Sequence, residues 1–174
     1  SPDMLLEFGT AYCLVGHSER RTHLGETDKM VAKKAKALQA AGISPVICVG
    51  ETAAERKRGD ATKVVRAQVR EAMEGLKVDA RAPFVIAYEP IWSIGTGQPC
   101  SARQAKEMHD AIHEVIFKKF KVKCGEVRVI YGGSVEPRNI SEYLNTVGID
   151  GALVGGASLD PRSFGLLCRS AAPA

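Results

Sequence analysis

Glu89 places a titratable carboxylate directly after the apolar run FVIAY at 84–88, and Pro90 follows it. A buried strand gains nothing from such a charge, because desolvating an unpaired carboxylate costs several kcal/mol. The position therefore predicts either a structural partner, in an ion pair or a cap, or a site that uses the charge. The residues at the other strand ends bear on that choice.

Polar residues and glycines follow each of five apolar runs in this sequence. In chain order these run ends are Gly16, His17, Ser18 and Glu19; Gly50 and Glu51; Glu89 and Pro90; Gly132, Gly133 and Ser134; and Gly155 and Gly156. The carboxyl ends of parallel strands share one edge, where α/β proteins build their sites. We expect these side chains to gather at that edge, although a histidine after a glycine is also typical of a simple turn.

The two glycine pairs predict phosphate binding. Each pair is followed by a helix pattern, so exposed backbone N–H groups and a positive helix end point the same way. The hydroxyl of Ser134 adds a donor beside the first pair. One glycine pair alone indicates no more than a tight turn.

The elements that position these residues are short strands alternating with helices. Continuous apolar runs predict strands covered on both faces at 11–16, 45–50, 84–89, 127–133 and 151–156. Apolar residues at helical spacing predict four helices, with stripes at Val31, Ala35 and Leu38; Val65, Val69, Ala72, Met73 and Leu76; Ala105, Met108, Ile112 and Ile116; and Ile140, Tyr143, Leu144 and Val147. Capping signals are expected at Thr52 with Glu55, at Ser101 with Gln104, and at Asp160. This alternation predicts parallel βα units in one α/β domain over 1–174.

Composition excludes several classes of function. The chain has 174 residues, 45% of them hydrophobic and 25% charged, which is ordinary for a globular domain. No apolar run reaches the roughly 20 residues of a membrane helix, and a net charge of +4 is too small to predict nucleic-acid binding. Five cysteines without a CxxC pair indicate reduced thiols in the cytoplasm. His109 and His113 lack a third ligand nearby, so we expect no metal site there.

Seven segments resemble the triosephosphate isomerase family, in the family's order. They are YCLVGHSERR (12–21), GETD (25–28), VICVGE (46–51), AYEPIWSIGTG (87–97), QAKEMH (104–109), VIYGGSV (129–135) and DGALVGGASL (150–159). The resemblance implies a (β/α)8 TIM barrel that interconverts dihydroxyacetone phosphate and D-glyceraldehyde 3-phosphate, in glycolysis and gluconeogenesis, without metal or organic cofactor. It also implies a cytoplasmic homodimer that acts on a small phosphorylated triose.

The resemblance assigns roles residue by residue. Glu89 matches the base that removes a proton beside the substrate carbonyl, and His17 matches the neutral imidazole that polarises that carbonyl. Supporting positions are Glu19, Glu51 as partner of the Trp92 indole, and Tyr131 as latch of the closed lid; phosphate-binding positions are Gly95, Ser134, Gly155 and Gly156. The lid comprises Pro90, Ile91, Trp92, Ser93, Ile94, Gly95, Thr96, Gly97, Gln98 and Pro99.

The chain departs from the family pattern in two ways. The far lid hinge is Gln98-Pro99-Cys100 rather than Lys-Thr-Ala or similar, and proline restrains the backbone, so lid closing is expected to be altered. A full barrel has eight strands in about 250 residues, whereas this sequence supplies five, corresponding to strands 4–8. We therefore expect an incomplete barrel that lacks the asparagine and lysine of strand 1 and the main dimer-interface loop.

Such a chain is expected to be inactive or very weak alone. The alternative is a non-catalytic truncated fragment that binds phosphate ligands or self-associates. A different phosphosugar barrel enzyme, such as an epimerase, would share the two glycine turns but leaves GHSERR and the Trp-containing lid without explanation.

Overall fold

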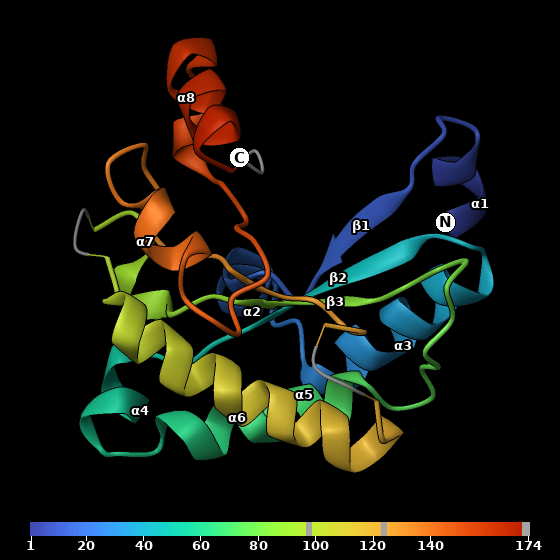
Figure 1. The fold of residues 1–174 in the computed structure, drawn as a ribbon. Helices are drawn as coiled ribbons and strands as arrows, with labels where there is room; N and C mark the ends of the chain where they lie inside the picture. The colour runs from blue at the N-terminus through green and yellow to red at the C-terminus, as the bar shows by residue number, and fades with distance from the viewer. Residues whose placement is uncertain (97–98, 123–124, 172–174) are drawn as a thin grey trace.

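Four parallel strands form one sheet in sequence order. They are β1 (Tyr12–Val15), β2 (Ser44–Val49), β3 (Val85–Tyr88) and β4 (Val129–Tyr131), and Figure 1 shows the first three side by side. The structure is a computed structural model that describes residues 1–96, 99–122 and 125–171. Ile47 lies opposite Ile86, which in turn lies opposite Val129, so the strands stay in register across the sheet.

The fifth predicted strand, at 151–156, is reduced to one parallel bridge between Tyr131 and Ala152. Backbone hydrogen bonds from Tyr131 N to Gly151 O and from Leu153 N to Tyr131 O flank the bridge. The predicted extent was therefore wrong for this segment. Glycine weakens strand pairing, and the chain turns at Gly155 into a short 3-10 helix, which ends the ladder.

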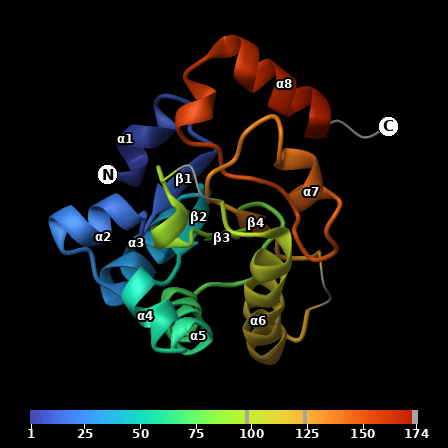
Figure 2. The same ribbon diagram turned by 90° about the vertical axis from the view of Figure 1, so that its left-hand side faces the viewer.

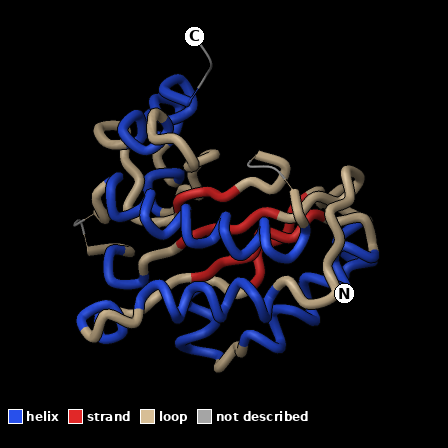
Figure 3. Tube along the Cα trace, turned by 60° about the horizontal axis from the view of Figure 1, so that its bottom comes forward, coloured by secondary structure: helices blue, strands red, loops and turns tan. Residues whose placement is uncertain are grey.

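Helices connect the strands and lie in an arc around them (Figure 2). Their bounds are α1 (Pro2–Leu6), α2 (Ser18–Leu24), α3 (Asp28–Ala40), α4 (Ala53–Lys57), α5 (Ala61–Ala72), α6 (Ala102–Phe120), α7 (Ile140–Leu144) and α8 (Pro161–Ala171), with 3-10 turns η1 (Ile91–Ser93) and η2 (Gly156–Ser158). The strands run together through the middle of the molecule with helices beside them (Figure 3). None of the helices within the described ranges is long and apolar enough to cross a membrane.

The capping signals in the sequence are confirmed. Thr52 with Glu55 and Ser101 with Gln104 form complete capping boxes at α4 and α6. The carboxylate of Asp160 accepts from the backbone N–H groups that begin α8. These contacts satisfy donors that a helix start otherwise leaves unpaired, so the helices begin where the sequence predicts.

The helical stripes form the core between the helices and the outer face of the sheet. Val31, Val65 and Ile112 are fully buried there. The prediction for Val147 was wrong, because α7 ends at Leu144 and the Val147 side chain is 83% exposed.

The inner face of the sheet carries a smaller cluster of Val46, Cys48 and Ala87. Two apolar side chains of β1 remain open to solvent, with Tyr12 54% and Leu14 45% exposed. The inner face is therefore only partly covered by the described residues.

Two histidines of α6 converge on one carbonyl. His109 Nδ1 and His113 Nε2 each lie 3.1 Å from the carbonyl oxygen of Gly148. In the part of the chain that the structure describes, the buried Nε2 of His109 has no hydrogen-bond partner. Burial lowers the pKa of His109 to about 4, against the weaker opposing effect of the Gly148 carbonyl. Within the described residues, no cluster of three His, Cys, Asp or Glu side chains could hold a metal.

Acid is therefore expected to destabilise the fold through His109. The pKa of His109 in the folded state lies below the unfolded value of about 6.5. The contribution of the neutral ring to the free energy of unfolding is therefore fully present above pH 6.5. That stability is lost as the pH falls from about 6.5 to about 4, by on the order of 3 kcal/mol. Urea unfolding across this window measures the loss. His109→Gln should flatten the pH dependence and His23→Gln, on an exposed histidine, should not. An unchanged slope in His109→Gln would contradict the assignment.

Candidate active site

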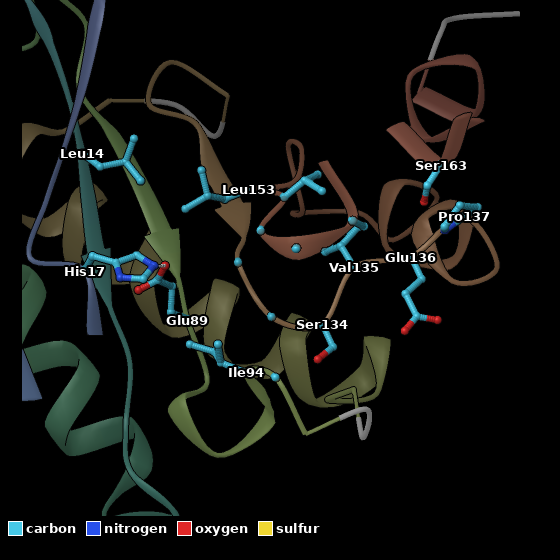
Figure 4. Close-up of a pocket in the computed structure, with 17 residues that line it drawn as sticks. Leu14, His17, Glu89, Ile94, Ser134, Val135, Glu136, Pro137, Leu153 and Ser163 are labelled. Carbon is cyan, nitrogen blue, oxygen red and sulfur yellow. Dashed lines mark ion pairs between the residues drawn. The ribbon is translucent and has the colours of Figure 1, made fainter. Parts of the chain in front are cut away.

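A cavity of about 630 Å³ opens at the carboxyl ends of the strands. His17, Glu89, Ser134 and Ile94 point toward it (Figure 4). The turns at 132–133 and 155–156 also line it. The fold thus brings together residues from the ends of several apolar runs, between positions 17 and 156 of the chain, as the sequence predicts.

Glu89 is buried at the end of β3, with 3% of its surface exposed. Its Oε1 atom lies 3.3 Å from His17 Nε2, and Oε2 accepts from the backbone N–H of Ser18 at 3.4 Å. Burial raises the pKa of Glu89, while His17, the Ser18 N–H and the Cys48 thiol oppose that rise more weakly. A carboxyl group with a raised pKa beside an imidazole is suited to accept a proton near neutral pH.

His17 is held in one tautomer by the helix it precedes. It is the N-cap of α2, and its Nδ1 accepts from the backbone N–H of Glu19 at 3.4 Å. A ring nitrogen that accepts a hydrogen bond carries no proton, so the ring proton is on Nε2, which faces Glu89. The carboxylate of Glu19 itself is exposed and does not line the cavity.

Glu51 ties the segment after Glu89 to the end of β2. The buried carboxylate accepts from Trp92 Nε1 at 2.8 Å, from Tyr88 Oη at 3.1 Å and from Arg56 Nη1 at 3.0 Å. The Arg56 guanidinium also lies 4.8 Å from the centre of the Trp92 ring, within cation–π range. Glu51 and Arg56 thereby hold the Trp92 side chain of η1 in place.

Of the remaining predicted positions, Ser134 and Gly95 line the cavity and Tyr131 does not. Ser134 Oγ donates to the Ser93 carbonyl at 2.6 Å, and Gly95 has a positive φ of 68° that favours glycine. Tyr131 is buried and stacks on Tyr143 at 4.2 Å. The lid positions Gly97 and Gln98 lie outside the described residues.

Sequence reasoning missed two residues that shape the turn before His17. Arg21 Nε donates to the Gly16 carbonyl at 2.6 Å and Nη2 to the Cys48 carbonyl at 3.2 Å, which joins the ends of β1 and β2. Glu26 accepts from Gly16 N at 3.2 Å and pairs with Lys34. The charged segments SERR and GETD were the available signal, but their partners come from other elements.

The fold and the site together define a class of protein. A parallel α/β sheet carries a buried carboxylate, a tautomerically fixed imidazole and two glycine turns at the carboxyl ends of its strands. That edge is where (β/α)8 barrel enzymes carry their sites.

Comparison with known proteins gives the family within that class. The family model described as triosephosphate isomerase matches residues 1–171. Proteins named triosephosphate isomerase are 49% identical over 165 residues in Lactobacillus gasseri, 48% in Streptococcus thermophilus and 49% in a Thermoanaerobacter species, covering 94% of this chain each time. The chain belongs to the triosephosphate isomerase family and forms an incomplete TIM barrel. It spans 66% of the length of these relatives.

Proposed function

We propose that this chain carries the acid–base centre of a triosephosphate isomerase, which interconverts dihydroxyacetone phosphate and D-glyceraldehyde 3-phosphate. The observation that carries the proposal is the pair of Glu89 Oε1 and His17 Nε2, 3.3 Å apart beside two glycine turns. The names of the relatives support the same reaction. By the same likeness, we place the activity in cytoplasmic glycolysis and gluconeogenesis, in a homodimer.

Glu89 is the base of the proposed reaction. Its carboxylate takes a proton from the carbon beside the substrate carbonyl, and the C–H electron pair forms the C=C bond of an enediolate. The carbonyl oxygen takes up the negative charge. Return of the proton to the neighbouring carbon completes the isomerisation. The raised pKa of Glu89 brings the group closer to neutral pH, where a general base is most effective.

His17 stabilises the oxygen that becomes charged. Its Nε2–H donates to the carbonyl oxygen, and the ring then moves a proton between the two substrate oxygens. Glu19 supports this role through its backbone N–H, which keeps Nδ1 unprotonated. Because a neutral imidazole is the donor, no charged group has to be desolvated beside Glu89.

The phosphate group is proposed to bind at Gly155, Gly156, Ser134 and Gly95. Backbone N–H groups at glycine turns approach an anion closely, because no Cβ stands in the way. A Cβ at Gly155 or Gly156 would meet no atom within 4 Å, so these turns are open on the ligand side.

Residues 90–99 are proposed to form the lid of the site. Ile94 and Gly95 already line the cavity. Closing would exclude water from the enediolate, a gating role for which this family is itself a standard example. Glu51 anchors Trp92 at the near end, and Tyr131 is the proposed latch. Pro99 at the far end is proposed to alter the closing motion, because proline fixes φ.

Residues 1–174 are proposed to form one domain corresponding to barrel strands 4–8. A single large apolar cluster that spans Val15 to Leu167 supports this. Among the described residues that line the cavity, none is lysine or arginine. One missing electrostatic group typically costs roughly 10²- to 10³-fold in rate, so turnover by these 174 residues alone is expected to be slow.

The test pairs binding with turnover on one sample. We expect calorimetry to detect binding of 2-phosphoglycolate, which mimics the enediolate phosphate. A coupled assay should detect slow isomerisation. Inorganic phosphate is the control, and it should bind more weakly because it lacks the carboxylate that faces His17. Binding without turnover would favour the non-catalytic alternative. Neither binding nor turnover by a folded sample would refute the proposal.

A further inference from the structure

Two buried hydroxyls, one on the lid and one at the end of β4, converge on the turn at 132–133. Ser93 and Tyr131 are fully buried, and neither Ser93 Oγ nor Tyr131 Oη has a hydrogen-bond partner among the described residues. A Cβ placed on Gly133 would lie 3.0 Å from Ser93 Oγ and 2.0 Å from Tyr131 Oη, so both hydroxyls converge on that glycine. Leaving a buried hydroxyl unsatisfied is costly, so two of them side by side require an explanation.

Ser93 is also the point at which the lid contacts the turn after β4. Its carbonyl accepts from Ser134 Oγ at 2.6 Å and from Thr96 Oγ1 at 3.2 Å, while its N–H donates to Pro90 O at 2.9 Å. The Ser134 hydroxyl and the Ser93 carbonyl thus join the turn to the lid, and Thr96 adds a contact within the lid. The neighbouring Trp92 is fixed separately by Glu51.

The two hydroxyls influence each other. Burial raises the pKa of Tyr131, and the nearby hydroxyls of Tyr143 and, more weakly, Ser93 oppose that rise. A lowering of the Tyr131 pKa by Ser93 fits a Ser93 O–H that points toward the Tyr131 oxygen. A small movement of the lid would bring the two groups into hydrogen-bond geometry.

We propose that the Ser93 hydroxyl is a positioning group of the lid, which pairs with Tyr131 Oη and holds residues 91–96 against the turn at 132–133. The role rests on the proposed function, because the lid covers the proposed site. Ser93 touches no substrate in this role; it acts through Tyr131. The pairing sets the equilibrium between molecules whose lid is held against the turn and molecules whose lid is released.

Trp92 makes the proposal measurable without turnover. It is the one tryptophan in the sequence and the residue next to Ser93, so its fluorescence reports on the lid alone. A typical hydrogen bond shifts such an equilibrium by about two- to tenfold. We expect Ser93→Ala to raise the released population by that factor, seen as stronger acrylamide quenching of Trp92. Thr146→Ala, which removes an exposed hydroxyl far along the chain, should leave quenching unchanged.

A double-mutant cycle separates pairing from general loosening. Tyr131→Phe removes the partner hydroxyl and keeps the ring that stacks on Tyr143. If the two hydroxyls act as a pair, Ser93→Ala with Tyr131→Phe is quenched no more than either single variant. Additive effects, or no effect of Ser93→Ala in a protein with unchanged circular dichroism, would overturn the proposal. Because no substrate is present, this result is independent of whether the chain isomerises triose phosphate.

Discussion

Glu89→Gln is expected to lower the rate of triose phosphate isomerisation by about 10²- to 10⁴-fold, the usual contribution of a positioned general base. Glutamine keeps the shape of the side chain, but its amide cannot accept the substrate proton. Binding of 2-phosphoglycolate should change far less than turnover, because the proposed phosphate contacts come from other turns. Initial rates in the coupled assay, with calorimetry on the same samples, measure both.

The matched control is Glu71→Gln on α5, at a residue that has no assigned role in the site. It makes the same chemical change on an exposed carboxylate whose side chain does not line the cavity. Its rate should stay close to that of the parent. Equal losses in the two variants, or an unaffected Glu89→Gln, would remove Glu89 from the role of base.

The same replacement should also stabilise the fold. Burial raises the pKa of Glu89, so the folded state disfavours the charged form, and the cost of holding it charged is fully felt above the folded pKa. A neutral amide carries no such cost. The melting temperature of Glu89→Gln at pH 8 is expected to exceed that of the parent, which would fit a carboxylate kept for chemistry rather than stability.

Gly50→Ala is expected to prevent folding or to destabilise the protein by more than about 4 kcal/mol, the range reached by severe steric changes in a core. A Cβ at Gly50 would lie 1.7 Å from the carbonyl oxygen of Glu89. The backbone cannot withdraw easily, because Glu89 N donates to Val49 O at 2.7 Å and Gln68 bonds both the N–H and the C=O of Gly50. Relief requires β2 and β3 to separate.

Urea unfolding followed by circular dichroism measures this effect. Gly165→Ala is the control, since that glycine lies inside α8 and a Cβ there would approach only Arg169, at 3.8 Å. Alanine in a helix interior should stabilise by roughly 0.5–1 kcal/mol. A Gly50→Ala protein that unfolds at the same midpoint as the parent would show that the contact with Glu89 is not tight.

The parts of the fold that depend on local pattern were predictable from sequence. Continuous apolar runs marked four strands, and Thr52 and Ser101 marked helix starts, because strand burial and capping depend on residues close in the chain. The strand predicted at 151–156 was too long, because its pairing depends on the backbone conformation around Gly155. Val147 was misplaced because one apolar residue cannot show where α7 ends.

The site was predictable where strand order alone brings residues together. Glu89 and His17 follow strands on either side of β2, so a shared edge was sufficient to place them near each other. The family resemblance gave Glu51 as the partner of Trp92. The contacts of Glu51 with Tyr88 and Arg56, and the hydrogen bond from Arg21 to Cys48, depend on side-chain packing between different elements. The Ser93 and Tyr131 hydroxyls depend on the path of the lid itself. Periodicity and spacing carry no information on such contacts.

Exchange of a substrate proton with solvent tests most directly whether Glu89 and His17 enolise a triose phosphate. Dihydroxyacetone phosphate is incubated with the 174-residue chain in D2O, and proton NMR follows deuterium entering the carbon beside the carbonyl. We predict exchange faster than in buffer alone, falling to the buffer rate in Glu89→Gln. A rate no faster than buffer with a folded chain, or the same rate in Glu89→Gln, would contradict the claim.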